Sequence, residues 1–282
     1  MKICRTKQEI RDTVKAFRSA GESVGLVPTM GFLHDGHLTL VRTAQSRTDR
    51  VIVSIFVNPT QFGEAADLNA YPRDEARDFA LLKAEGIDAV FCPSVDEMYH
   101  PDKQTTVLTE ELDKTLMGAL RPGHFKGVCT VVTKLFNITT PDQAFFGEKD
   151  YQQLQVIKTM VRDLDMPVEI TGVPTVRDVD GLAMSSRNVR LSAEDRKAAR
   201  ILNKALAYAD YEVSDGRNAQ DLEEEIRAFI AREPRAQIES VDVRDATTLQ
   251  KVEGKITRPV VILLAARFGD VLLIDQRVAH PA

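Results

Sequence analysis

The stretch PTMGFLHDGH (residues 28–37) contains His34 and His37, two of only five histidines in the chain. It follows an apolar run, and Gly36 directly precedes the second histidine, as expected where a strand turns into a helix. Three interpretations fit such a pair: a metal site, a phosphate-binding turn, or two surface residues without a chemical role.

The phosphate-binding turn is the interpretation that we favour. Zinc sites of the HExxH type place their histidines four residues apart and need a further ligand, but no other histidine or cysteine lies nearby. The first N–H groups of a helix lack partners within the helix and favour anions. Two imidazoles at this point would add hydrogen-bond donors aimed at the same phosphates.

The glycine motifs that usually bind phosphates are absent. Gly31 and Gly36 have the spacing of a P-loop, as do Gly118 and Gly123, but histidine follows each pair in place of lysine and Ser or Thr. No two glycines are separated by one residue, so the GxGxxG fingerprint of dinucleotide-binding folds is missing. The chain also has no GxSxG elbow and no CxxC pair.

Two further stretches place polar side chains near apolar runs. In IFVNPTQF (residues 55–62), Asn58 and Gln61 follow a strand-like run, where they would either touch a substrate or form a simple Asn-Pro turn. RPGHFKG (residues 121–127) precedes an apolar helix and would either bind a carboxylate or phosphate or be solvated. Its polar side chains are Arg121, His124 and Lys126.

Two more stretches combine a glycine turn with a cation. FGEKDYQQ (residues 146–153) places Lys149 and Asp150 at a predicted helix start, where the helix dipole disfavours a lysine, which indicates a ligand phosphate as its partner. GLAMSSRN (residues 181–188) brings two serines and Arg187 into a loop. Hydroxyls and a cation suit a triphosphate, although an exposed loop would account for each of these residues alone.

The elements that must position these residues alternate between strand and helix. Short β-branched or aromatic runs predict strands at 23–28, 50–58, 87–92, 143–147 and 168–173. Helical patterns lie between them at about 36–47, 73–85, 126–138 and 150–164. This order predicts an α/β domain with a Rossmann-like parallel sheet and helices on both faces. Ligands of such sheets lie at the carboxyl ends of the strands.

The pattern becomes α+β after about residue 175. A turn at DVDG (residues 178–181) precedes helices near 192–210 and 218–232 and strands near 238–243, 259–266 and 270–274. We therefore expect a larger domain at 1–175 and a smaller C-terminal domain at 176–282.

Composition excludes several classes of protein. The net charge of −5 and the pI near 5.7 argue against a general nucleic-acid or membrane binder. The charged N-terminal stretch has no apolar signal-peptide core, and the longest apolar run, residues 259–266, is too short to span a bilayer. Cys4, Cys92 and Cys129 are odd in number and widely spaced. We expect a soluble cytoplasmic protein with reduced thiols.

Taken together, PTMGFLHDGH and MSSRN resemble the HxGH and KMSKS pair of the nucleotidyltransferase superfamily. More narrowly, all five stretches match the pantothenate synthetase (pantoate–β-alanine ligase) family in order and approximate spacing, over nearly the full chain. The resemblance implies ATP-dependent joining of (R)-pantoate to β-alanine through a pantoyl-adenylate, with release of AMP and pyrophosphate. It also implies Mg²⁺, a C-terminal lid domain and a homodimer; the metal ligands are unknown.

The resemblance also assigns residues. It implies that His37 is a proton donor and that His34, Lys149 and Arg187 are catalytic as well. For pantoate and β-alanine it implies Gln61, and for pantoate Gln153, with Arg121 and His124 as further neighbours. The implied ATP contacts are Met30, Gly31, Phe32, Leu33, His34, Asp35, Gly36, His37, Gly147, Glu148, Lys149, Asp150, Val176, Met184, Ser185, Ser186 and Arg187.

The expected chemistry fits these residue types. Attack of a carboxylate on the α-phosphorus builds charge on the leaving pyrophosphate, so fixed cations and donors are the main catalytic resource. The stretch MSSRN lacks the KMSKS lysines, so Arg187 and Lys149 would have to replace their charge. The alternative is an adenylyltransferase of the same superfamily that acts on another small substrate and leaves AMP on its product.

Overall fold

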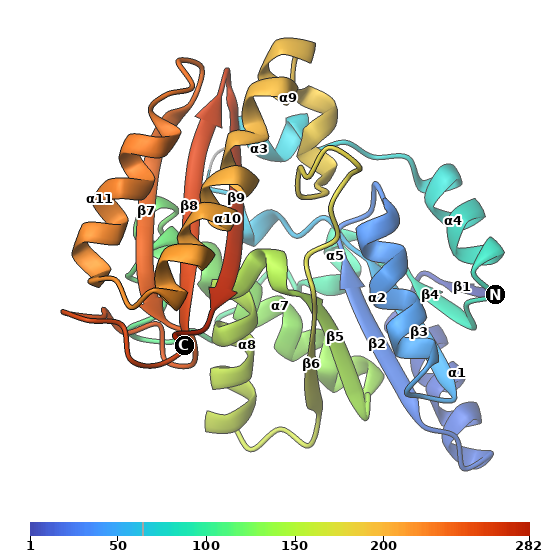
Figure 1. Ribbon diagram of the computed structural model, residues 1–282. Coiled ribbons are helices and arrows are strands. Elements are labelled where there is room, and N and C mark those ends of the chain that lie inside the picture. Colours follow the sequence, from blue (N-terminus) through green and yellow to red (C-terminus); the bar gives the residue numbers. More distant parts are fainter. Residues whose placement is uncertain (64) are drawn as a thin grey trace. The chain divides into compact units, whose positions relative to one another are not determined.

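The computed structural model describes residues 1–63 and 65–282, and the chain divides into two compact units (Figure 1). The N-terminal unit comprises Met1–Gly147 and Val156–Pro174, and the C-terminal unit comprises Glu148–Gln155 and Thr175–Ala282. The short segment Glu148–Gln155 thus belongs by its contacts to the C-terminal unit. None of the helices in the described part of the chain is long and apolar enough to cross a membrane.

The N-terminal unit is built on a six-stranded sheet in which every neighbouring pair is parallel, as predicted. Its order is β1-β4-β3-β2-β5-β6. The strands are β1 (Lys2–Cys4), β2 (Val24–Thr29), β3 (Arg50–Ile55), β4 (Ala89–Phe91), β5 (Gln143–Gly147) and β6 (Glu169–Val173). From β2 the chain continues on one side to β3 and β4, and later on the other side to β5 and β6. The order therefore reverses between β2 and β5, which is where such sheets bind ligands.

One face of this sheet is covered by α2 (Asp35–Gln45) and α4 (Glu75–Ala84). Successive strand residues point to opposite faces. Accordingly, the alternate residues Val51, Val53 and Ile55 of β3 join the apolar core to which both helices contribute.

The opposite face is covered by α1 (Lys7–Ser19) and α7 (His124–Thr139), which pack on each other. Cys4 of β1 lies beside Phe91 of β4 in the sheet register, and its sulfur lies 3.6 Å from the Thr13 hydroxyl of α1. Helices therefore cover both faces, which confirms the predicted α/β fold.

The predicted helices correspond to α2, α4, α7 and α8 (Tyr151–Asp163). Neither β1 nor α1 was predicted. The same holds for the short helices η1 (Pro59–Gln61), α3 (Ala65–Ala70), α5 (Val95–Met98) and α6 (Met117–Leu120).

The C-terminal unit contains a three-stranded antiparallel sheet in the order β7-β8-β9. Its strands are β7 (Gln237–Asp245), β8 (Val260–Phe268) and β9 (Val271–Ala279). The helices α10 (Ile201–Ser214) and α11 (Ala219–Ile230) pack on this sheet (Figure 1). The helix predicted at 192–210 is in fact two helices, α9 (Ala193–Ala199) and α10, because Arg200 with ψ of −14° interrupts the α-helical pattern. The strand predicted at 270–274 extends to Ala279.

Candidate active site

His34 and His37 lie at the start of α2, as the sequence predicts, and each caps the helix through its side chain. His34 is the N-cap residue, and its Nδ1 accepts a hydrogen bond from the Gly36 N–H at 3.2 Å. In return, Nδ1 of His37 accepts from the His34 N–H at 3.3 Å. The two rings lie 4.1 Å apart between centroids. This is a capping box in which two imidazoles replace the usual hydroxyl and carboxylate.

The capping box fixes the tautomer of both rings. A ring nitrogen that accepts a hydrogen bond carries no proton, so in the neutral imidazole the proton is on the other nitrogen. Nδ1 is the acceptor in both His34 and His37. Each ring therefore has Nε2–H as its donor, and protonating either ring at Nδ1 would break a capping hydrogen bond.

The loop between β2 and α2 is held by one buried carboxylate. Asp78 of α4 is 1% exposed, and it accepts from the N–H groups of Phe32 and Leu33, both at 2.7 Å. Burial raises the pKa of Asp78, and the two backbone hydrogen bonds oppose that rise. Phe32 has a positive φ of 50°, which is uncommon for a residue with a side chain. The aspartate therefore holds the loop in a conformation that the chain would not adopt readily alone.

Gly31 and Arg77 complete the support of this loop. Gly31 has φ of +80°, and a Cβ there would lie 3.0 Å from the Asp78 carboxylate, so only glycine fits. Arg77 donates to the Leu33 carbonyl at 2.9 Å and its guanidinium lies over the Phe32 ring. The HDGH turn is thus positioned by α4, a helix that the sequence analysis linked to no function.

The second predicted stretch is organised by Asn58, which is 1% exposed. Its Nδ2 donates to Oε1 of Gln61 at 3.0 Å and to the Gly127 carbonyl at 3.1 Å. Its Oδ1 accepts from the Tyr99 hydroxyl at 2.8 Å and from Thr60. Because Oε1 of Gln61 accepts from Asn58, the amide nitrogen of Gln61 is directed away from it, and this nitrogen lies 3.2 Å from the Met30 sulfur.

The third predicted stretch packs on the second. His124 is the first residue of α7 and is therefore helical. The prediction that it lies in a loop before the helix is wrong. Its Nδ1 lies 2.8 Å from the carbonyl oxygen of Gln61. A Cβ on Gly127 would lie 2.5 Å from the Thr60 carbonyl oxygen, so the absence of a side chain permits this close packing. Arg121 instead faces Asp67, at 3.8 Å.

The N-terminal unit thus brings together Met30, Gln61 and His124, which belong to three separate stretches of sequence. The turn that contains His34 and His37 follows β2, at the carboxyl edge where the strand order reverses. Polar donors therefore gather at the edge where a ligand is expected.

Gly147 is the last residue of β5 in the N-terminal unit. The other remaining predicted residues lie in the C-terminal unit, where Val176 and Met184 are paired across a hairpin. The Met184 N–H donates to the Val176 carbonyl at 2.9 Å, and the Asp178 N–H donates to the Leu182 carbonyl at 2.8 Å. Gly181 forms the turn with φ of +87°, as the DVDG signal predicts. Two stretches implied separately for ATP are thus one structural element.

The MSSRN residues follow this hairpin directly. Ser185 caps the short helix η3 (Ser186–Arg190) by accepting from the Arg187 N–H at 3.3 Å. Ser186 is buried, and the side chain of Asn188 donates to the Ala183 carbonyl at 3.0 Å.

Lys149 lies in the 3₁₀ helix η2 (Glu148–Asp150), which directly precedes α8. Its ammonium is 3.9 Å from the Asp150 carboxylate, and its side chain is 18% exposed. The Tyr151 hydroxyl donates to the Ala246 carbonyl at 2.7 Å, which attaches this segment to the rest of the C-terminal unit. Gln153, in the first turn of α8, is half-buried.

Two side chains that support the site, Asp78 and Tyr99, were not predicted. Each is far in sequence from the stretch that it holds, and neither belongs to a recognisable motif. The one sequence signal for Asp78 is that it is a single carboxylate on the apolar face of a predicted helix. In the part of the chain that the structure describes, no group of three or more His, Cys, Asp or Glu residues could hold a metal ion.

Comparison with known proteins identifies the family. Residues 2–278 match the pantoate-beta-alanine ligase family. The pantothenate synthetase of Bartonella tribocorum is 53% identical over 277 residues, which cover 98% of this chain and 97% of that protein. The pantothenate synthetase of Sinorhizobium medicae is 51% identical over 282 residues, covering 100% and 97%.

Solved structures agree. A crystal structure of pantothenate synthetase from Thermus thermophilus has a TM-score of 0.92 at 43% identity and covers 98% of this chain and 99% of that one. Pantoate-beta-alanine ligase from Francisella tularensis, complexed with beta-gamma ATP and beta-alanine, has a TM-score of 0.82 at 34% identity and covers 99% and 97%. The chain therefore belongs to the pantoate-beta-alanine ligase family and is an enzyme that condenses pantoate with β-alanine.

Proposed function

We propose that this member of the pantoate-beta-alanine ligase family drives amide formation with ATP, through a pantoyl-adenylate, and releases AMP and pyrophosphate. A carboxylate does not react with an amine until its oxygen becomes part of a good leaving group, and AMP is such a group. The Francisella tularensis ligase was crystallised with an ATP compound and β-alanine together, which supports both ligands for this chain.

The observation that carries the proposal is the paired capping of α2 by His34 and His37. It directs Nδ1 of each ring to the backbone and puts the proton of the neutral ring on Nε2, beside the positive end of a helix dipole at the carboxyl end of β2. We assign residues Met30 to His37 to the ATP phosphates and His37 to proton donation. The second role requires the imidazolium form, so in this proposal His37 is protonated beside the bound triphosphate and gives up its capping hydrogen bond. Donors fixed before the reaction stabilise developing charge without reorganisation.

Lys149 and Arg187 supply the fixed positive charge in this proposal. We assign both to the pyrophosphate that leaves in the first step, where charge develops. The remaining assigned ATP contacts are Gly147, Glu148, Asp150, Val176, Met184, Ser185 and Ser186. No enzyme nucleophile is needed, because the adenylate is itself the activated acyl group.

We assign pantoate recognition to the amides of Gln61 and Gln153, with Arg121 and His124 as further neighbours, and β-alanine contact to Gln61. An amide can both donate to and accept from a hydroxyl. The contact between His124 and the Gln61 carbonyl supports their grouping. The ion pair of Arg121 with Asp67 makes it a weaker candidate for a substrate carboxylate.

Magnesium fits this chain as an ion carried by the nucleotide. Mg²⁺ at nucleotide sites usually has phosphate oxygens and water as ligands, plus one or two protein carboxylates. The described residues contain no cluster of three or more metal-binding side chains, and this sparse donor set suits such an ion. Asp150 is the half-exposed carboxylate within the proposed phosphate stretch. When bound, the ion would neutralise charge on the leaving pyrophosphate.

The remaining proposals concern the roles of the two domains, the oligomeric state and the location in the cell. We propose that residues 1–175 form the ATP- and pantoate-binding domain. Residues 176–282 act as a lid that adds the ATP contacts between Val176 and Arg187 and shields the adenylate from water. We also propose a homodimer in the cytoplasm. Three buried cysteines with free thiols are consistent with a reducing compartment.

The test is to identify the products made from ATP, pantoate and β-alanine. We expect free AMP and pyrophosphate in amounts equal to pantothenate, with activity lost when EDTA removes Mg²⁺. An adenylyltransferase would instead leave AMP attached to its product. No nucleotide turnover would indicate a binding protein, and ADP formation would contradict the adenylate route.

A further inference from the structure

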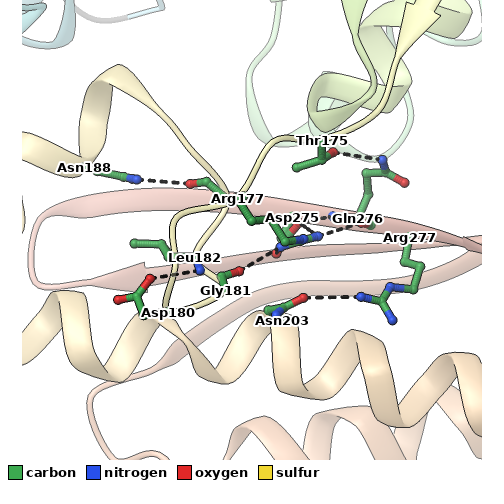
Figure 2. A network of polar contacts seen from close by, with 11 residues as sticks. Thr175, Arg177, Asp180, Gly181, Leu182, Asn188, Asn203, Asp275, Gln276 and Arg277 are labelled. Carbon is green, nitrogen blue, oxygen red and sulfur yellow. Dashed lines mark hydrogen bonds and ion pairs between the residues drawn. The ribbon is translucent and has the colours of Figure 1, made fainter. Parts of the chain in front are cut away.

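The candidate nucleotide hairpin, residues 176–184, is fixed to strand β9 by an ion pair that the proposed function does not use. Arg177 directly follows Val176, and its guanidinium contacts both carboxylate oxygens of Asp275, at 2.6 and 2.9 Å (Figure 2). The side chain of Asp275 is 2% exposed and that of Arg177 is 19% exposed. The pair is therefore largely removed from water.

The Arg177 guanidinium also forms hydrogen bonds to the backbone of both the hairpin and β9. It donates to the Gly181 carbonyl at the hairpin turn, at 3.2 Å, and to the Gln276 carbonyl on β9, at 3.4 Å. Asp275 also accepts from the Gln276 N–H at 2.8 Å. One side chain therefore contacts the turn and the strand together, as Figure 2 shows.

Residues of α9 and α10 also contact the hairpin. Arg196 of α9 forms ion pairs with Asp178 at 2.7 Å and Asp180 at 3.6 Å. A Cβ on Gly181 would lie 2.5 Å from the side-chain amide of Asn203 on α10, so the turn lies close to that helix. The hairpin thus meets α9, α10 and β9, all within the C-terminal unit.

By itself, a buried ion pair is poor evidence that the fold is stabilised. The cost of removing two charges from water can exceed their attraction, and apolar pairs of similar size often replace such pairs without loss. A paired geometry is nevertheless strongly preferred once both charges are buried, because either charge alone is costly. The pair is thus better suited to fixing one position of the hairpin than to stabilising the fold.

We propose that Arg177 and Asp275 are positioning residues for ATP: they hold Val176 and Met184–Arg187 on the C-terminal sheet in the geometry that binds the nucleotide. This inference rests on the proposed ATP contacts of the hairpin. Neither side chain needs to touch ATP, and the pair acts by setting where the hairpin backbone and the following MSSRN residues lie.

The first test variant is Asp275→Asn, which keeps the shape of the side chain and leaves Arg177 without its counter-ion. Arg177→Lys keeps the charge but not the two-pronged contact, and serves if the first variant does not fold. Glu239→Gln is the control for loss of an ion pair on the same sheet. Glu239 of β7 pairs with Arg267 of β8 at 2.6 Å, in a more exposed position than the Arg177–Asp275 pair. Amide hydrogen exchange and the kinetics of ATP use are measured for each.

We expect faster exchange of the Asp178 and Met184 amides in Asp275→Asn, since these donate across the hairpin. A displaced binding element can cost about a hundredfold in rate, so we expect kcat/KM for ATP to fall by about ten- to a hundredfold, with KM for β-alanine nearly unchanged. Arg177→Lys should show a smaller effect of the same kind, and Glu239→Gln neither effect.

The double variant Arg177→Met with Asp275→Leu separates the positioning of the hairpin from the contribution of the pair to thermal stability. It should recover thermal stability, as apolar replacements of buried pairs often do, but not ATP use. Recovery of both would mean that the pair is only structural, and would overturn the proposal. Unchanged hairpin exchange in Asp275→Asn would overturn it as well.

The outcomes also distinguish this proposal from the proposed function. If the hairpin amides of Asp275→Asn exchanged faster but the kinetics of ATP use did not change, the pair would not position ATP. The assignment of the hairpin to the nucleotide site would then be wrong as well. Failure of the wild-type enzyme to form AMP would instead contradict the proposed function, whatever the variants do.

Discussion

His34 and His37 together close the start of α2: each Nδ1 accepts a backbone N–H in the first turn of the helix, from Gly36 and His34 respectively. The two residues are thus structural, and the proposed function gives them a chemical role as well. Their Nδ1 atoms close the helix end, and in the neutral rings the proton is on Nε2. This division of roles between two nitrogens of one ring underlies the first prediction.

His37→Ala should lose about a hundredfold or more in adenylate formation, the usual cost of removing one preorganised donor. It should lose only about 1 kcal/mol of stability, the usual cost of a capping interaction. Pyrophosphate release and thermal unfolding measure the two effects. His100→Ala is the control, because His100 has a 77% exposed side chain. Near-wild-type pyrophosphate release from folded His37→Ala would contradict the assignment.

Asp78→Asn should destabilise the protein by about 1–3 kcal/mol, because one of two buried backbone N–H groups would lose its acceptor. It should also raise KM for ATP, since the loop before His34 is displaced. Denaturant unfolding and initial rates are the measurements. Asp74→Asn is the matched control on the same helix, where asparagine can replace aspartate as the N-cap. Equal effects of the two substitutions would mean that Asp78 has no special role.

Lys149→Ala should slow adenylation more than amide formation, because charge on pyrophosphate develops only in the first step. Supplying preformed pantoyl-adenylate with β-alanine separates the steps. Lys158→Ala, at an exposed position of α8, is the control. An equal defect with preformed adenylate would mean that Lys149 does not act on the pyrophosphate.

Gln61→Ala and Gln153→Ala should each weaken pantoate use strongly and ATP binding little. An unpaired amide in a dry pocket costs roughly 1–3 kcal/mol, so each variant should also discriminate less, by about ten- to a hundredfold, against pantoate analogues that lack a hydroxyl. Steady-state kinetics with pantoate and a deoxy analogue decide this, with exposed Gln8→Ala as control. Unchanged selectivity in both variants would place the pantoate pocket elsewhere.

The cysteines should react slowly in the folded protein. Burial raises the pKa of Cys92 and of Cys129 to about 12, from an ordinary value of 9.0. Because these folded pKa values are raised, the thiols stay protonated while the unfolded ones ionise, so stability should fall as pH rises above about 9. Labelling at pH 8 with a thiol reagent should be slow until denaturant is added. Fast labelling of native protein would contradict the burial of these side chains.

Much of the fold could be predicted because its signals are local. Apolar runs such as 50–58 and the glycine turn before His37 are readable from neighbouring residues alone, and alternation of strand and helix implies a parallel sheet. The strand at 50–58 is in fact shorter, ending at Ile55, because Asn58 and Pro59 start a 3₁₀ helix that the pattern does not reveal. Likewise, His124 is helical because α7 begins earlier than its apolar pattern.

The sequence by itself determined the family, the alternation of the sheet's strands with helices and the residue types of the candidate site, because motifs and periodicity are properties of neighbours in the chain. Only the tertiary structure decided which distant side chains support them. Asp78 holds the loop at Phe32 across 46 residues, and Asp275 pairs with Arg177 across 98. A lone aspartate carries no sign of its partner, since the partner is chosen by how helices and strands pack and by the cost of burying an unpaired charge.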